Sequence, residues 1–354
     1  MSVLMVTKPF APPWHDSSSG LARALVTGLL DREDAPALRV MVGSHPSGLS
    51  GLTEERIYRD AGNFAPGLRQ NLPVLLRLLR TEGERGRHFF FAPNPRTAMA
   101  ARCARWICRR PSVHTLCSLP AVGVGVKPSL FAERHVVVSP WAQRRLAAEG
   151  VEAQLIEPAV LPLESSDAGR ARCRERFGDY VLFAGDWRAG GGAEVALAVA
   201  QQLPDGLNLV LACRAKTPAD EQRRAAFERR LREESFGHVH VLGRIDWIGD
   251  LVSAARAQLL PATDLTGKMD WPLVVLEGFA AGVPAVVADN SPMADLDEPV
   301  LASAPIADVS AVTQAVERMA ALDRDVARSV YARRFTPKRM AKDYASVYRE
   351  LGLM

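Results

Sequence analysis

The sequence has few cysteines and no closely spaced cysteine pairs. Its five cysteines are scattered and odd in number: Cys103, Cys108, Cys117, Cys173 and Cys213. Disulfide frameworks and structural zinc sites are built from regularly spaced pairs, so this pattern favours neither. We therefore expect a reduced cytoplasmic protein without a metal site.

Long hydrophobic runs are also lacking. No stretch reaches the ~18 apolar residues that a membrane-spanning helix needs. The first residues, MSVLMVT, are apolar but have no basic leader, so they predict a first strand rather than a signal peptide. We expect a protein that is soluble or peripheral to the inner face of the membrane.

The chain has little excess charge of either sign. Its net charge is +4 at pH 7, and 24% of its residues are charged. A nucleic-acid-binding protein would show a dense basic patch, so we expect no nucleic-acid partner. The length of 354 residues and the hydrophobic content of 48% allow two globular domains, each with its own core.

What the sequence does contain is an alternation of apolar strands and amphipathic helices. In the first half we expect strands at 3–7, 38–44, 88–92, 113–118 and 135–139, with helices at 19–30, 68–80 and 96–110. This order predicts a doubly wound parallel sheet. Ligands bind such sheets at the carboxyl ends of the strands.

The alternation continues in the second half. We expect strands at 181–184, 207–214, 238–244, 257–261 and 284–289, with helices at 193–202, 272–281, 309–322 and 337–351. The segment 161–168, LPLESSDA, has the composition of a linker. We therefore predict a first domain at 1–162, a second domain at 163–335 and a terminal helix at 336–354.

Two loops rich in small residues lead into helices. One is KPFAPPWHDSSSG, which ends near Ser19 and Gly20, and the other is GDWRAGGGAE, which contains Gly185 and Arg188. A loop of this kind can bring backbone N–H groups to a phosphate at a helix N-terminus. A plain capped helix stays the alternative, because neither loop has a complete phosphate-binding fingerprint.

The central stretch, residues 268–290 (KMDWPLVVLEGFAAGVPAVVADN), places one carboxylate inside an apolar helix. At helical spacing Glu277 shares its face with Leu273, Val274, Ala280 and Ala281. A buried carboxylate without a partner is costly. We expect it to bind the hydroxyls of a ribose or sugar. The alternative is that it reaches the surface or pairs with an arginine.

The run PLVVLEGFAAGVPAVVAD resembles the nucleotide-sugar-binding segment of retaining glycosyltransferases of the GT-B fold, a bacterial nucleotide-sugar-dependent class similar to glycosyltransferase family four. In that family two glutamates bracket the segment. The second binds the donor ribose and falls on Glu277. The first contacts the donor sugar and falls on Met269, so the neighbouring Asp270 is the expected catalytic substitute.

The resemblance implies an α/β architecture of the GT-B type: two doubly wound Rossmann-like domains with a cleft between them and a C-terminal crossover helix. The second domain would hold the nucleotide-sugar donor, with Leu273 and Arg244 near the nucleotide. The usual diphosphate cations fall on Asp186 and a glycine, so Arg188 or Lys268 would replace them. A family histidine falls on Cys117, and His15 lies in a loop that would line the cleft. We take both as catalytic candidates.

The implied activity is retaining, metal-independent transfer of a sugar from a nucleotide-diphosphate donor to a small-molecule, glycan or lipid-linked acceptor, with no further cofactor. Two alternatives stay open. One is a sugar-nucleotide epimerase of the same fold. The other is a catalytically silent binding or partner subunit, suggested by the departures at Asp186, Met269 and Cys117.

A basic, partly aromatic helix end follows residue 100. It contains Arg102, Arg105, Trp106, Arg109 and Arg110. One interpretation is a weak membrane-surface contact. The other, which the sequence favours, is a solvated helix whose cations lie near its C-terminus.

Overall fold

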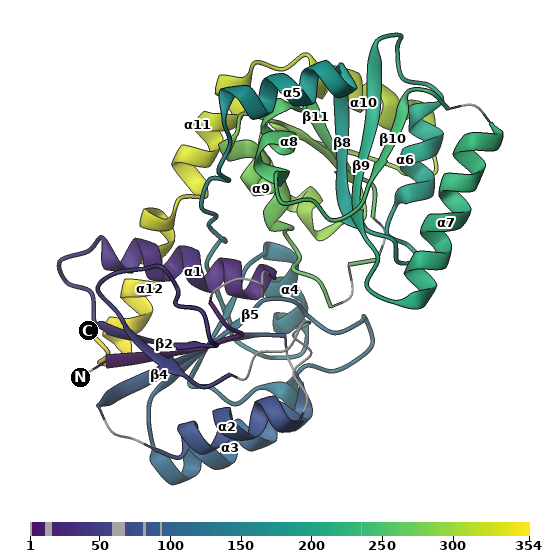
Figure 1. Cartoon of the computed structure of the whole chain (residues 1–354). Coiled ribbons are helices and arrows are strands. Elements are labelled where there is room, and N and C mark those ends of the chain that lie inside the picture. Colours follow the sequence, from purple (N-terminus) through teal and green to yellow (C-terminus); the bar gives the residue numbers. More distant parts are fainter. Residues whose placement is uncertain are drawn as a thin grey trace. The chain divides into compact units, whose positions relative to one another are not determined.

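The chain forms two compact units, seen in a computed structural model that describes residues 2–10, 16–58, 68–80, 83–92, 94–234, 236–262, 264–265 and 267–354 (Figure 1). The first unit comprises Met1–Leu161, Thr266–Leu273 and Arg334–Met354. The second comprises Pro162–Leu265 and Val274–Arg333. The chain thus passes between units near residues 161, 265, 273 and 333.

The first unit is built on a seven-stranded parallel sheet with the order β3-β2-β1-β4-β5-β6-β7. Its strands are β1 (Ser2–Val6), β2 (Ala37–Val42), β3 (Thr53–Arg56), β4 (Glu84–Phe91), β5 (Ser112–Leu116), β6 (Arg134–Val137) and β7 (Gln154–Leu155). Its helices are α1 (Ser17–Leu30), α2 (Leu68–Leu78), α3 (Pro95–Cys108), α4 (Pro140–Ala148) and α12 (Pro337–Glu350), with a 3-10 turn, η1, at Lys127–Ser129.

The second unit has a six-stranded parallel sheet with the order β10-β9-β8-β11-β12-β13. Its strands are β8 (Asp179–Asp186), β9 (Leu207–Arg214), β10 (Val239–Leu242), β11 (Ala257–Leu260), β12 (Ala285–Ala288) and β13 (Leu301–Ala304). Its helices are α5 (Asp167–Phe177), α6 (Ala193–Ala200), α7 (Pro218–Glu233), α8 (Ile248–Ala254), α9 (Leu273–Ala280), α10 (Val309–Ala320) and α11 (Arg324–Arg334), with a 3-10 turn, η2, at Pro292–Asp295.

Continuous apolar strands explain why both sheets lie inside their units. All five residues of β1 and all four residues of β12 are buried, as parallel strands covered on both faces should be. The predicted pair of doubly wound parallel sheets is therefore confirmed. The edge strand β3 was not predicted, because its sequence TEER has no apolar residue.

The C-terminal helix α12 packs on α1 within the first unit. A Cβ at Gly28 of α1 would lie 2.2 Å from the carbonyl oxygen of Pro337, so only glycine allows this close crossing. Thr336 caps α12, and Met340, Ala341, Tyr344 and Tyr348 form its buried face at helical spacing. In the described part of the chain, no helix combines the length and apolar character that a bilayer crossing requires.

Candidate functional site

The candidate site residues of the first unit lie at the carboxyl edge of its sheet. The strand order changes direction between β1 and β4, and ligands of doubly wound sheets bind at such a switch point. The loop after β1 contains Lys8 and Asp16. Cys117 follows β5, which lies beyond β4 in the sheet. His15, one of the predicted catalytic residues, lies outside the described residues.

Asp16 occupies the N-terminus of α1. Its Oδ1 accepts hydrogen bonds from the Ser19 amide at 3.0 Å and from the Ser18 hydroxyl at 2.7 Å, and Oδ2 pairs with Lys8. Burial favours the protonated acid, but Lys8 and the Ser19 amide outweigh it and hold the pKa of Asp16 below its usual value. A phosphate at Ser19 would therefore have to displace a carboxylate. The sequence signal for this cap was available, because Asp followed by three serines is a typical helix start.

Gly20 and Leu273, both predicted near the donor, meet in the first unit. A Cβ at Gly20 would lie 3.2 Å from Cδ1 of Leu273. Met269 and Leu273 are themselves buried, with 4% and 7% of their surface exposed. Their side chains therefore fill the core of the unit, and a ligand would meet mainly the backbone of this segment.

Cys117 is buried at the end of β5. Its thiol donates to the carbonyl oxygen of Thr115 at 3.7 Å. Burial and the nearby Asp16 carboxylate raise the pKa of the Cys117 thiol far above its usual value. The thiol therefore stays protonated at neutral pH, so any catalytic contribution would be as an uncharged group.

Asp270 is held by Ser139, which is 131 residues distant in sequence. Ser139 Oγ donates to Asp270 Oδ2 at 2.7 Å and accepts the Ala142 amide at 3.0 Å, which caps α4. Asp270 is only 3% exposed, and burial raises its pKa to about 6. A carboxyl group with this pKa can give or take a proton near neutral pH. Asp270 was predicted from the sequence, but its pairing with Ser139 was not.

In the second unit the switch point lies between β8 and β11. The loop after β8 runs through Gly192, whose φ of 100° lies in the left-handed region and whose Cβ would come within 2.8 Å of Pro261. Gly192 starts α6, as predicted for a glycine-rich loop that precedes a helix. The loops after β8 and β11 therefore touch at the expected ligand edge.

Two of the predicted residues, Gly185 and Arg188, lie at this edge. Gly185 is the penultimate residue of β8, and the Arg188 guanidinium pairs with Asp264 of the loop after β11. Arg188, the cation predicted for a diphosphate, thus lies on the loop after β8, where a carboxylate holds it in this structure.

Asp186 brings two further cations to the same strand ends. Its Oδ2 accepts from Lys216 Nζ at 2.7 Å, and its Oδ1 lies 3.6 Å from Arg214 Nε. Both cationic side chains are about half exposed, whereas the Asp186 side chain is buried. Lys216 was not predicted from the sequence, because its proximity to Asp186 depends on the pairing of β8 with β9.

Glu277 lies in α9, where it is half-buried among apolar neighbours. Within the described residues, no donor hydrogen-bonds its carboxylate and no cation pairs with it, so the alternative of an arginine partner is not observed. Burial raises its pKa to about 7. The carboxylate therefore carries a solvation cost that a hydroxyl-bearing ligand would relieve.

The remaining predicted residues are less constrained. Arg244 is exposed in the loop after β10, and Lys268 is half-buried on the segment that joins the units.

The described part of the chain has no group of three or more His, Cys, Asp or Glu residues arranged to hold a metal ion. Metal independence nevertheless stays a prediction.

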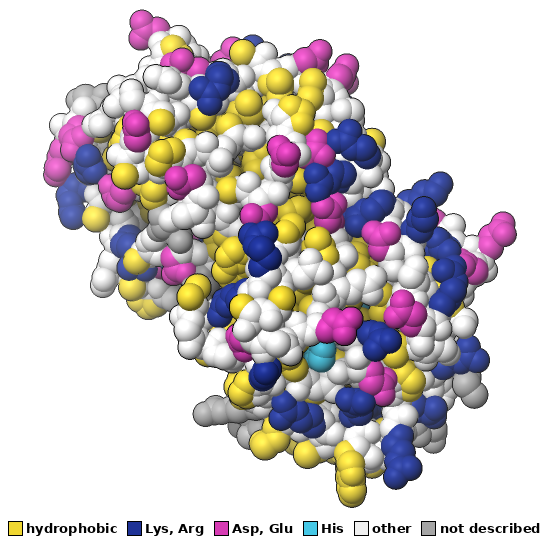
Figure 2. All heavy atoms as spheres, turned by 180° about the vertical axis from the view of Figure 1, so that it is seen from behind, with side chains coloured by type: hydrophobic (Ala, Val, Ile, Leu, Met, Phe, Trp, Pro, Cys, Tyr) yellow, Lys and Arg dark blue, Asp and Glu magenta, His cyan; other side chains and the backbone are white. Residues whose placement is uncertain are grey.

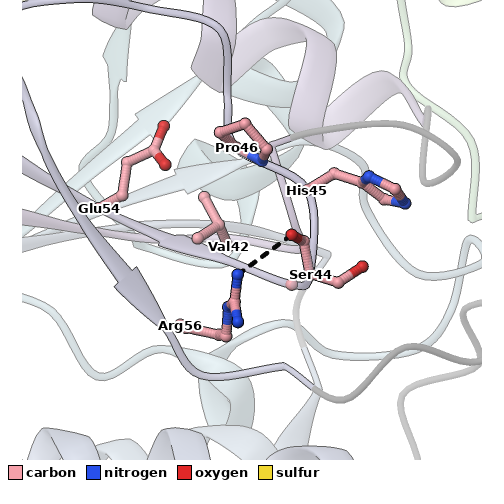
Figure 3. Close-up of a pocket in the computed structure, with 7 residues that line it drawn as sticks. Val42, Ser44, His45, Pro46, Glu54 and Arg56 are labelled. Atoms are coloured by element: carbon pink, nitrogen blue, oxygen red, sulfur yellow. Dashed lines mark hydrogen bonds between the residues drawn. The ribbon is translucent and has the colours of Figure 1, made fainter.

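A separate cavity of about 330 Å³ lies at the carboxyl end of β2. Figure 3 shows Glu54 and Arg56 of β3 beside the loop 43–46, with Arg56 Nη2 donating to the Ser44 carbonyl at 3.3 Å. Glu54 accepts the Ser47 amide at 2.7 Å. These charged groups hold the loop in place, and the His45 side chain points away from both of them (Figure 3).

Residues 178–321 match a family model described as "Glycosyl transferases group 1". The match covers most of the second unit, including Gly185, Arg188, Arg244 and Glu277. No curated protein matches the sequence.

Solved structures similar to the chain include Alr3699/HepE of Anabaena, at 14% identity and a TM-score of 0.76, covering 99% of this chain and 100% of that one. It was solved with UDP and also with UDP-glucose. Sucrose-phosphate synthase from Thermosynechococcus elongatus is 16% identical, with a TM-score of 0.73 and 99% of each chain covered. The catalytic domain of starch synthase IV from Arabidopsis thaliana, bound to ADP and acarbose, is 14% identical, with a TM-score of 0.70 and 99% of each chain covered.

These similarities extend over whole chains, and at this identity they establish the fold. The chain has the GT-B fold, with two Rossmann-like domains of seven and six parallel strands. The predicted fold class is therefore confirmed.

Proposed function

We propose that the protein is a glycosyltransferase that moves a sugar from a nucleotide-diphosphate donor to an acceptor with retention of anomeric configuration. The observation that carries this proposal is Glu277, a half-buried carboxylate without a protein partner in the described residues, on the helix of the second unit that resembles the donor-binding segment of the family. The match of residues 178–321 to a glycosyltransferase family model supports it independently.

In this proposal the Glu277 carboxylate accepts hydrogen bonds from the two ribose hydroxyls of the donor. These bonds replace water at a site where burial raises the pKa of Glu277 to about 7. The charge-assisted bonds also stabilise the ionised form of Glu277, so nucleotide binding should release a proton near neutral pH.

The diphosphate would bind at the switch point of the second sheet. Arg188 can exchange Asp264 for a phosphate oxygen, and Lys216 can approach from the loop after β9. Lys268 is the further candidate on the connecting segment. These cations and the N-terminus of α6 would stabilise the departing nucleoside diphosphate, with neither a metal nor a cofactor required.

Asp270 and its Ser139 partner are proposed to contact the transferred sugar. A carboxyl with a pKa of about 6 can accept a hydrogen bond from a sugar hydroxyl when ionised and donate one when protonated. The acceptor, a small molecule, glycan or lipid-linked sugar, is proposed to bind the first unit.

A thermal shift assay with UDP, GDP and ADP tests the proposal directly. UDP and ADP are the nucleotides bound in the similar structures. A ligand at one hundred times its dissociation constant adds ~2.7 kcal/mol of stability. A folded protein that no nucleoside diphosphate stabilises would overturn the proposal in favour of a silent partner subunit. Products formed from donor alone would instead indicate an epimerase.

The role of Glu277 is tested by matching ligand and variant. Glu277→Gln should weaken UDP or GDP binding, whereas 2′,3′-dideoxy nucleotides should bind the variant and the wild type almost equally, because the hydroxyls that distinguish them are absent. Glu175→Gln, an exposed acid of α5 in the same unit, is the matched control and should change neither affinity. Proton NMR of the product anomer tests retention.

A further inference from the structure

The exposed hydrophobic side chains of this protein are concentrated in one part of the first unit. The large exposed ones in the described residues lie in or just after α2, in α3 and in the loop before η1: Leu72, Leu76, Leu79, Met99, Trp106, Ile107, Val122 and Val124. Trp106 is 81% exposed and Val122 83%. Single exposed apolar residues are ordinary, but a concentration of this kind marks an interaction surface.

The outer face of helix α3 is more apolar than expected for a helix face that contacts only water. Its inner face is buried through Ala98, Ala101 and Ala104. At helical spacing the opposite face carries Met99, Cys103 and Trp106, all exposed. The 3-10 turn η1, which directly follows this loop, is fixed beside α3, because Arg102 donates to the carbonyl oxygens of Pro128 at 3.0 Å and of Leu130 at 2.7 Å.

The charge of this region is mainly positive. Of the acids that contact it, Glu133 pairs with Arg105 and Glu149 accepts the Val126 amide. Between residues 85 and 132 the sequence contains eight Lys and Arg residues and no Asp or Glu. Arg102, Arg109 and Lys127 are exposed, and Figure 2 shows basic side chains among hydrophobic ones along the rim of the first unit at the bottom of the view. The surface therefore complements a partner that is apolar inside and negatively charged at its boundary.

We propose that this surface, formed by α3 and the loop 121–127 with α2 beside them, docks the protein on an anionic lipid bilayer. Trp106, Ile107 and Met99 would enter the interface between headgroups and acyl chains, where tryptophan is favoured. Arg102, Arg109 and Lys127 would lie over the anionic headgroups. The inference concerns a surface outside the candidate donor site, so it does not rest on the proposed function.

Arg109 provides a test that separates charge from folding. It is the non-glycine residue with a positive φ in the described chain, at 49°, just after the end of α3. Glycine adopts this conformation without strain, so Arg109→Gly should fold at least as stably as the wild type. It removes a cation from the surface without a structural cost.

The experiment is co-sedimentation of the full chain with vesicles of phosphatidylcholine alone and of phosphatidylcholine with phosphatidylglycerol. We expect binding only to the anionic vesicles, weakened by salt. Trp106→Ala should lower the partition coefficient about tenfold or more, and Arg109→Gly about fivefold. Arg229→Ala, an exposed arginine of α7 in the second unit, is the matched control and should not change it.

Two results would overturn the proposal. One is the absence of binding to anionic vesicles by a folded wild-type protein. The other is a wild-type dimer in light scattering that Trp106→Ala converts to a monomer, without vesicle binding, which would make this surface an interface between two copies of the chain. Nucleotide binding is measured separately, so failure here leaves the proposed donor site untouched.

Discussion

His88 Nδ1 lies 2.7 Å from the hydroxyl of Tyr348, and both groups are completely buried. On the other side of the ring, His88 Nε2 lies 2.8 Å from Thr115 Oγ1, which in turn lies 2.6 Å from the Tyr344 hydroxyl. This network joins β4 and β5 to the C-terminal helix α12 across 260 residues of sequence. It gives α12 a fixed register on the sheet, because each polar group has a specific partner.

Tyr348→Phe should destabilise the first unit by ~1–3 kcal/mol, since it leaves a buried imidazole nitrogen without its partner. Chemical denaturation followed by circular dichroism measures this loss. Tyr344→Phe should act similarly, and the double variant should lose less than the sum because both tyrosines belong to one network. An unchanged unfolding midpoint in Tyr348→Phe would mean that the hydrogen bond does not hold the helix.

The first unit should lose stability as the pH falls below about 6.5. Burial lowers the pKa of His88 well below its usual value, that of His114 to about 3 and that of His135 to about 4. The unfolded chain therefore binds protons first, which decreases the free energy of unfolding by up to ~1.4 kcal/mol per pH unit for each histidine.

Asp270 opposes this trend between about pH 4 and 6, because its pKa is raised, but a single carboxyl cannot offset three histidines. His114→Phe keeps a ring among Phe91 and Phe131 and should reduce the slope by about one proton. Stability that does not change between pH 7 and 5 would contradict the prediction.

Glu277→Gln should raise the stability of the unliganded protein at pH 8 by ~1–2 kcal/mol, because the folded carboxyl has a pKa of about 7 whereas the unfolded one titrates near its usual value. The folded state binds the proton more tightly, so the wild type loses stability as the pH rises through this interval. At pH 4, where the carboxyl is mostly protonated in both states, the variant and the wild type should be nearly alike. Denaturation at both pH values distinguishes an unpaired Glu277 carboxylate from a structural ion pair, whose removal would destabilise the protein at pH 8.

Arg188→Ala should weaken nucleoside diphosphate binding by ~1.5–3 kcal/mol, the range for a hydrogen bond to a charged group. Asp264→Asn is the informative companion, since it removes the carboxylate that holds Arg188 in the absence of ligand. Titration calorimetry should then show equal or tighter binding in Asp264→Asn. If Arg188→Ala binds normally, the diphosphate contacts other cations, of which Lys216 and Lys268 are the next to replace.

Glu84→Gln should destabilise the first unit by ~3–5 kcal/mol. The Glu84 carboxylate is fully buried between Arg77, at 3.1 Å, and Arg87, at 2.5 Å. Its removal takes the charge partner from the buried Arg87 guanidinium, whereas Arg77 keeps its pair with Glu55. Asp34→Asn weakens two surface pairs, with Arg32 and with Arg349, and is the control, for which denaturation should show little change.

The sequence by itself determined the two sheets and the helix that carries Glu277, because hydrophobic runs of strand length, glycine-rich loops and proline and glycine at helix ends are local signals. Predicted strand 207–214 coincides with β9, and the terminal helix was placed within one residue. It also singled out Glu277, since helical spacing alone shows that its neighbours are apolar.

Only the tertiary structure decided which polar and charged side chains meet. Arg188 and Asp264 are 76 residues apart, Ser139 and Asp270 are 131 apart, and neither pair has a local signature. The segment 267–273 reads as continuous with α9, yet its contacts assign it to the first unit. Pairings of this kind depend on the spatial order of the parallel strands in each sheet, which brings loops together irrespective of their separation in sequence. The burial that raises the pKa values of Asp270 and Glu277 exists only in the folded protein.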